Sequence, residues 1–251
     1  MVKTGVFAFG ILLLFAASPA FLSAKSKDAK SKEKPASQMV DSGSFGIFQN
    51  GRRVATEVFS ISTSDGVSTV ESRIQAPDSN EARQTSKMQI GADGSLISYE
   101  WHELQEPNAE LTLMPKNEFL TERLKQSPTS KPMEHPFLMP RTSVILDDNF
   151  TVQREVFAWR FLASSCKQEK TDFKCAASLF GTIDPQEANS IPVTAQPGGV
   201  DEISVRGVKR QLWKVNLKND SEMWSLWLDP ADHYKLIRLT RDGVNMEVLR
   251  D

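Results

Sequence analysis

Alternating hydrophobic and polar positions are clearest in the C-terminal third of the chain. Residues 212–218 (LWKVNLK) and 223–228 (MWSLWL) place a large apolar side chain at every second position. This period of two is typical of antiparallel strands that have one face on a core. Trp227 falls on the nominally outer face, so we expect a connecting helix or a neighbouring strand to cover that face too.

Four glycine-containing dipeptides separate segments of β-type sequence. They are Asn50-Gly51, Asp65-Gly66, Asp93-Gly94 and Asp242-Gly243. A type I′ turn needs positive φ at both central residues, and these residue types tolerate that conformation. The dipeptides therefore predict four β-hairpins, and the fold class is expected to be mainly β with antiparallel strands.

The middle of the chain departs from this pattern. Prolines at positions 128, 132, 136 and 140 recur every four residues, which disfavours both a central strand and a helix. We expect a long extended segment here that crosses the surface. After it, Asp147-Asp148-Asn149 supplies residues that favour the N-cap of a helix.

Residues 150–165 carry two competing periodicities. Apolar residues at Val152, Val156, Trp159 and Ala163 follow helical spacing, whereas Phe157, Trp159 and Phe161 alternate as they would in a strand. We favour one helix, packed on the concave face of the sheet. The predicted domain at 39–251 then comprises hairpins over 43–115, the crossing and helix over 116–166, and strands over 175–251.

The first 24 residues resemble a cleaved secretory signal. A positive Lys3 precedes the apolar run 5–17, and Ser18-Pro19-Ala20 offers small residues for signal peptidase. An uncleaved membrane anchor over residues 5–22 is the alternative. We expect a periplasmic or secreted protein, or with an uncleaved segment a membrane-anchored one.

Residues 25–38 (KSKDAKSKEKPASQ) contain no large apolar side chain. They are expected to form a Lys-rich disordered tether, which could contact anionic lipid head groups.

Composition limits the remaining classes. The 251 residues are 39% hydrophobic and 25% charged with a net charge of −2, which argues against a disordered chain and a multi-span membrane protein. Residues 1–38 carry +4 and leave −6 on the rest, so a nucleic-acid partner is not expected.

Cys166 and Cys175 lie nine positions apart. In an exported protein this pair predicts one disulfide. Two buried thiols or a metal pair are the alternatives, but the chain has no CxxC motif and its three histidines are scattered.

The segment LWLDPADHYKLIRLTRDGVNMEVL, residues 226–249, resembles bacterial outer-membrane lipoprotein carrier and sorting proteins and related exported half-barrel families. The resemblance covers 24 residues and transfers no site residue. It implies a curved antiparallel sheet, or half-barrel, whose concave side can hold an acyl chain or a helix.

No phosphate-binding loop, HExxH or GxSxG motif is present. Asp229, Asp232 and His233 could in principle perform acid–base chemistry, but a strand-ending turn explains them better. We therefore expect no catalytic activity, no cofactor and no metal.

Five aromatic residues are the candidate lining of an apolar ligand cavity, although core packing explains the same residues without a ligand and is the favoured explanation: Phe157, Trp159, Phe161, Trp213 and Trp224. The expected function is an exported, monomeric, non-enzymatic binding or carrier protein for a lipid-like ligand or a lipidated partner. The alternative is a structural or interaction module of the cell envelope whose barrel is plugged by its own helix and holds no ligand.

Overall fold

The computed structural model describes residues 37–169 and 172–251. The predicted signal segment 1–24 and positions 25–36 of the predicted tether lie outside these residues. The described elements are β1 (Gln38–Gln49), β2 (Arg52–Ser64), β3 (Val67–Gln75), β4 (Ala82–Ile90), β5 (Leu96–Glu103), β6 (Glu110–Lys116), β7 (Phe119–Lys125), β8 (Met133–Phe137), β9 (Val144–Ile145), α1 (Val152–Ser165), β10 (Cys166–Glu169), β11 (Asp172–Cys175), β12 (Ser178–Asp184), β13 (Asn189–Val205), β14 (Val208–Lys218), β15 (Met223–Asp229), β16 (Lys235–Arg241) and β17 (Met246–Arg250).

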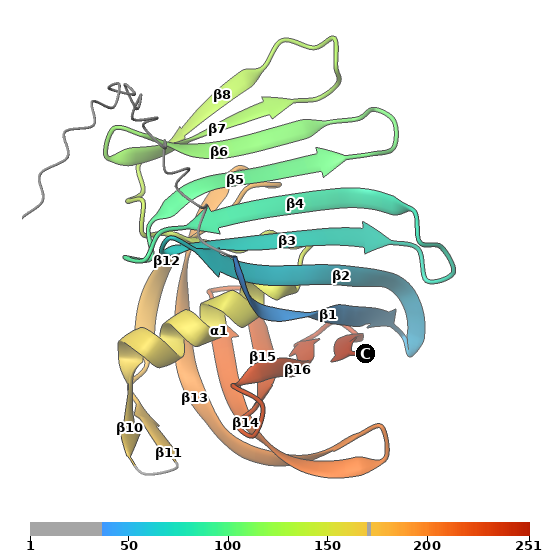
Figure 1. Ribbon diagram of the computed structural model, residues 1–251, viewed down its shortest axis with the longest axis vertical. Helices are drawn as coiled ribbons and strands as arrows, with labels where there is room; N and C mark the ends of the chain where they lie inside the picture. The colour runs from blue at the N-terminus through green and yellow to red at the C-terminus, as the bar shows by residue number, and fades with distance from the viewer. Residues whose placement is uncertain (1–36, 170–171) are drawn as a thin grey trace, which may run out of the picture. The chain divides into compact units, whose positions relative to one another are not determined.

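One curved sheet of 15 strands forms the framework, in the order β8-β7-β6-β5-β4-β3-β2-β1-β17-β16-β15-β14-β13-β12-β9 (Figure 1). Antiparallel pairing of β1 with β17 joins the N-terminal and C-terminal halves at the middle of this order. The sheet does not close into a barrel, because β8 and β9 are its two edges. The predicted fold class, mainly β with a curved antiparallel sheet, is confirmed; the short β9 adds one parallel pairing, with β12.

Two of the four glycine-containing turns have the expected backbone. Both residues have positive φ in Asn50-Gly51 (52° and 74°) and in Asp65-Gly66 (52° and 75°). In Asp93-Gly94 and Asp242-Gly243 only the glycine does, so the prediction of a type I′ turn is wrong there, although both join paired strands. Arg206-Gly207 has φ values of 51° and 77° between β13 and β14, a turn that its residue types did not signal.

The predicted crossing begins too early in the sequence. Residues 116–137 were expected to lie in it, but they contain β7 and β8, which extend the hairpin series. Pro136 lies inside β8, and β8 is an edge of the sheet. Proline is tolerated at an edge because its missing N–H can face away from the neighbouring strand. The crossing therefore starts after Phe137.

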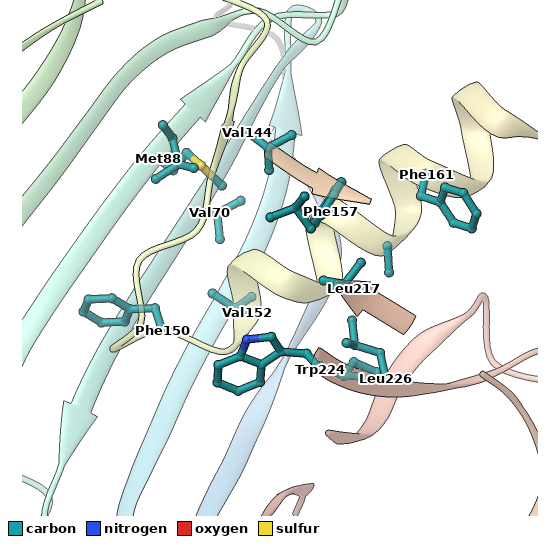
Figure 2. Close-up of a cluster of buried hydrophobic side chains, with 14 of the residues drawn as sticks. Val70, Met88, Val144, Phe150, Val152, Phe157, Phe161, Leu217, Trp224 and Leu226 are labelled. Atoms are coloured by element: carbon teal, nitrogen blue, oxygen red, sulfur yellow. The ribbon is translucent and has the colours of Figure 1, made fainter. Parts of the chain in front are cut away.

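Residues 152–165 form a helix, as the favoured interpretation predicted. In Figure 1, α1 runs between the two halves of the sheet. Its apolar side chains Val152 and Phe157 lie between Val70 and Met88 of β3–β4 on one side and Leu217 and Trp224 of β14–β15 on the other, as Figure 2 shows. The helix therefore fills the concave side of the curved sheet.

The helix does not begin with the predicted cap. Thr151 occupies the N-cap position without a side-chain cap hydrogen bond, and Asp147 instead accepts a hydrogen bond from the backbone N–H of Asn149. The backbone N–H groups of Thr151 and Val152 donate to the carboxylate of Glu57 on β2, at 2.6 and 3.1 Å. A carboxylate from a distant strand thus replaces the expected local cap.

Trp227 is buried on the outer face of β15, as its position in the alternation indicated. Lys214 and Arg238 of the neighbouring strands place their cationic groups 5.0 and 4.9 Å from the indole centroid. The Nε1–H of Trp227 donates to Asp201 of β13 at 2.8 Å. Neighbouring strands, rather than a helix, therefore cover this face.

Candidate functional site

The five aromatic residues singled out from the sequence belong to the packed interior. Phe157 is fully buried and meets Phe180 edge to face at 4.9 Å, while Phe161 stacks on Trp213 at 6.4 Å. Trp159 is half-buried and donates its Nε1–H to the backbone carbonyl of Tyr234. Core packing accounts for these contacts, and a ligand-lining role for these residues stays a prediction.

Trp224 has a different environment from the other four. The guanidinium groups of Arg154 on α1 and Arg241 on β16 lie 4.3 and 5.0 Å from the centroid of its indole ring. Arg154 donates to Asp148 at 2.6 Å, and Arg241 pairs with Glu222. These residues line a mixed-charge pocket of about 370 Å³.

The interior between α1 and β4–β5 holds little free space. A cavity of about 20 Å³ lies between β4–β5 and the helix, lined in part by Leu96, Gln153 and Phe157. A cavity of this size accommodates about one water molecule, whereas pockets for small-molecule ligands are typically about 300–1,000 Å³. An acyl chain would therefore have to displace side chains in order to enter here.

Two buried glutamates hold α1 in place. Glu57 accepts the helix N-terminal N–H groups and the hydroxyl of Ser72, and burial raises the pKa of its carboxyl. Glu155 on α1 accepts the backbone N–H of Leu236 at 2.8 Å and pairs with Arg250 at 3.1 Å. Burial raises the pKa of Glu155 to about 8, although Arg250 opposes the change. The helix is bonded to both halves of the sheet.

A larger apolar hollow lies outside this filled interior, on the inner face of β5–β7. Cross-strand neighbours Trp101, Leu111 and Leu124 line it. The other lining residues are Pro107, Ala109, Gln126 and Gln186, and the volume is about 490 Å³. We call this hollow, defined by these seven residues, the Trp101 groove.

The indole of Trp101, which lines the groove, has a buried N–H without a protein acceptor in the described part of the chain. Trp101 is 5% exposed, and within the described residues its Nε1–H has no partner. Because a buried indole N–H normally finds a partner, a polar acceptor on a bound molecule would complete it.

Acidic side chains lie directly beside the groove. Gln186 donates through Nε2 to Asp147 at 2.8 Å and through its backbone N–H to Asp184 at 3.0 Å. Asp147 also accepts the hydroxyl of Tyr99 at 2.5 Å. Burial and the nearby carboxylates of Asp148 and Asp147 raise the pKa of Asp184 to about 6.

Glu122 belongs to the same acidic group. It lies on the inner face of β7 in the row next to Leu124 and is only 2% exposed. Its Oε2 has no partner within the described residues. Burial, followed by the charge of Asp184, raises the pKa of Glu122 to about 7. The groove therefore adjoins buried and half-buried carboxyl groups whose pKa values are raised.

The cluster at the end of β15 is a turn with satisfied side chains. Asp229 pairs with Arg210 at 2.9 Å and accepts the backbone N–H of Ala231. Asp232 pairs with Lys235 at 3.1 Å. These contacts match the turn interpretation. Within the described ranges, no group of three or more His, Cys, Asp or Glu residues is arranged to hold a metal ion.

Cys166 and Cys175 form a disulfide, as the spacing predicted. They face each other across the β10–β11 hairpin, directly after α1. A structural disulfide indicates an environment outside the reducing cytosol. Over residues 37–169 and 172–251, no helix is long and apolar enough to cross a bilayer.

Comparison with known proteins yields a structural likeness alone. No protein-family model and no curated protein sequence matches the chain. Its structure is similar to the crystal structure of a β-barrel-like protein of the domain of unknown function DUF1849 from Brucella abortus. The TM-score is 0.46 and the sequence identity is 9%, and the match covers 84% of this chain and 94% of the other. That likeness is to a barrel-like protein of unknown function, not to a lipoprotein carrier.

Proposed function

We propose that the protein is an exported, non-enzymatic binding protein for a lipid-like ligand or for the acyl chain of a lipidated partner. The Trp101 groove carries this proposal. Its volume of about 490 Å³ lies within the range of ligand pockets, and its lining is mainly apolar. Gln126, Gln186 and the unpartnered indole N–H of Trp101 are the polar groups available to orient such a ligand.

The packing of α1 favours the groove over the interior as the ligand site. On its β4–β5 side α1 leaves a cavity of only about 20 Å³, and Glu57 and Glu155 bond the helix to the sheet. The pocket of about 370 Å³ beside Arg154 and Trp224 has several charged side chains in its lining, which suit an acyl chain less well. A ligand in the groove needs no movement of α1, because no residue of the helix lines the groove.

The second candidate is a structural or interaction module of the envelope that holds no ligand. The filled interior is the observation that favours it. In that case the helix serves only as a core element, and the Trp101 groove is a surface irregularity.

A filling substitution distinguishes the two candidates. Ala109→Phe adds an aromatic ring within the groove, whereas Met114→Phe adds one on the exposed outer face of β6. We expect an apolar fluorescent probe to bind the wild type and Met114→Phe alike, and Ala109→Phe at least tenfold more weakly. Circular dichroism verifies that both variants are folded.

Native mass spectrometry of protein purified from its own envelope provides the second measurement. We expect a bound lipid on the wild type and its loss in Ala109→Phe. A wild type that is always ligand-free and gives no probe response would eliminate the binding function and leave the plugged module.

A further inference from the structure

The acidic residues beside the Trp101 groove restrict the chemistry of its ligand. Leu124 lines the groove, and Glu122 lies two residues away on the same face of β7, about 7 Å along the strand. Gln186 also lines the groove and is hydrogen-bonded to both Asp147 and Asp184. Three carboxyl groups, those of Glu122, Asp147 and Asp184, therefore lie next to residues that line the groove.

Few cations neutralise this region. Arg154 donates to the side chain of Asp148 and to the backbone carbonyl of Asp147, and its guanidinium also lies on Trp224. Glu122 has a carboxyl oxygen with no partner at all within the described residues. An anionic group placed in the groove would meet uncompensated like charge in a partly desolvated site, where Coulomb interactions are strong.

From this arrangement we infer that the ligand of the Trp101 groove has an uncharged polar end, such as an ester, and that Glu122 determines this specificity by excluding anionic head groups. The inference rests on the proposed function and deepens it. The chemical class is a single acyl chain that ends in a neutral ester, as opposed to a free fatty acid.

The indole of Trp101 provides the complementary half of the recognition. Its Nε1–H can donate to an ester carbonyl oxygen but offers no positive charge that would hold a carboxylate. A neutral donor beside a group of acids distinguishes ligands by their charge. An ester gains a hydrogen bond, whereas a fatty-acid carboxylate gains the same bond and is repelled by Glu122 and Asp184.

Glu122 is a suitable residue for the test because one oxygen of its buried carboxyl has no hydrogen-bond partner within the described residues. Glu122→Gln removes a buried charge while it keeps the size of the side chain. Glu118→Gln is the matched control, since Glu118 is exposed in the turn between β6 and β7.

The experiment compares a monoacylglycerol with the fatty acid of the same chain length at pH 8, by competition with an apolar fluorescent probe. We expect the wild type and Glu118→Gln to prefer the monoacylglycerol at least tenfold. We expect Glu122→Gln to reduce this preference to about threefold or less. The variant should bind the fatty acid more tightly than the wild type does, and its affinity for the monoacylglycerol should be unchanged.

The outcomes separate the two proposals. Equal binding of both ligands by the wild type, or an unchanged preference in Glu122→Gln, overturns the inference about Glu122 and leaves the groove as a lipid site. No displacement by either ligand overturns the proposed function and the inference with it.

Discussion

Glu57 is a single residue on which the position of α1 depends. Its carboxylate accepts the N–H groups of Thr151 and Val152 and the hydroxyl of Ser72, all in buried surroundings. Glu57→Ala leaves these three donors without an acceptor, and we expect the free energy of unfolding to fall by about 2–4 kcal/mol in urea titrations. Glu57→Gln keeps one acceptor oxygen and should lose about half as much.

An exposed glutamate serves as the control for this prediction. Glu71 on β3 pairs with Lys87 at the surface, and Glu71→Ala should change the stability by less than about 1 kcal/mol. Equal losses in Glu57→Ala and Glu71→Ala would contradict the role of Glu57 as the acceptor at the helix N-terminus.

The sequence does indicate these buried acids, because each glutamate occupies an inward-facing position in the hydrophobic alternation of its strand. Glu57 is in phase with the inward-facing Phe59 and Ile61, and Glu122 is in phase with Leu120 and Leu124. A charged residue on a buried stripe must have a partner or a function, because its desolvation is unfavourable. The partner itself could not be predicted, since Thr151 lies 94 residues from Glu57.

At the scale of elements, the β10–β11 hairpin depends on its disulfide. It forms a separate two-stranded sheet, so it lacks the neighbouring strands that stabilise the main sheet. The Cys166–Cys175 bond closes a short loop and is expected to contribute about 2–3 kcal/mol. We expect the double variant Cys166→Ser with Cys175→Ser to lose that stability in urea titrations.

Hydrogen exchange locates the effect of this change. Amides of β10 and the last turn of α1 should lose protection against exchange in the double variant. Those of β14 and β15 should keep their protection under conditions in which exchange occurs through local unfolding. Unchanged protection at the helix end would show that the hairpin does not need the disulfide.

Elements were predictable from the sequence where their chemistry is local. Asn50-Gly51 and the alternation in β14 and β15 depend on neighbouring residues, and both predictions are confirmed. The proline-containing segment was misinterpreted because Pro136 is compatible with a strand only at an edge. Edge position is a property of the whole sheet. The Trp101 groove was missed for the same reason, since Gln186 reaches it from a distant loop.

At the scale of the whole sheet, Arg250 joins the two ends of the described chain to the helix. It pairs with Asp41 on β1 at 2.5 Å and with Glu155 on α1 at 3.1 Å, and its guanidinium lies over Phe45 and Phe59. Removing one partner of a buried ion pair typically costs about 3–5 kcal/mol. The β1–β17 pairing, the core and α1 are therefore one cooperative unit.

Buried acids give this unit a characteristic dependence on pH. The pKa is raised to about 8 in Glu155, to about 7 in Glu122 and to about 6 in Asp184, with burial as the largest cause in each. Between the ordinary carboxyl pKa and these values the folded chain binds more protons than the unfolded chain. The free energy of unfolding must then decrease as pH rises through this window.

We therefore expect the wild type to be more stable at pH 5 than at pH 8, by a few kcal/mol in urea titrations. Glu122→Gln removes one of the three acids. The decrease in its free energy of unfolding from pH 5 to pH 8 should therefore be smaller than that of the wild type by about 1–3 kcal/mol. The variant should also be the more stable protein at pH 8, because a neutral amide replaces a buried carboxylate. A wild type that gains stability from pH 5 to pH 8 would show instead that these carboxylates are compensated in the folded chain, and the negative charge assigned to the carboxyl groups beside the Trp101 groove would then be absent.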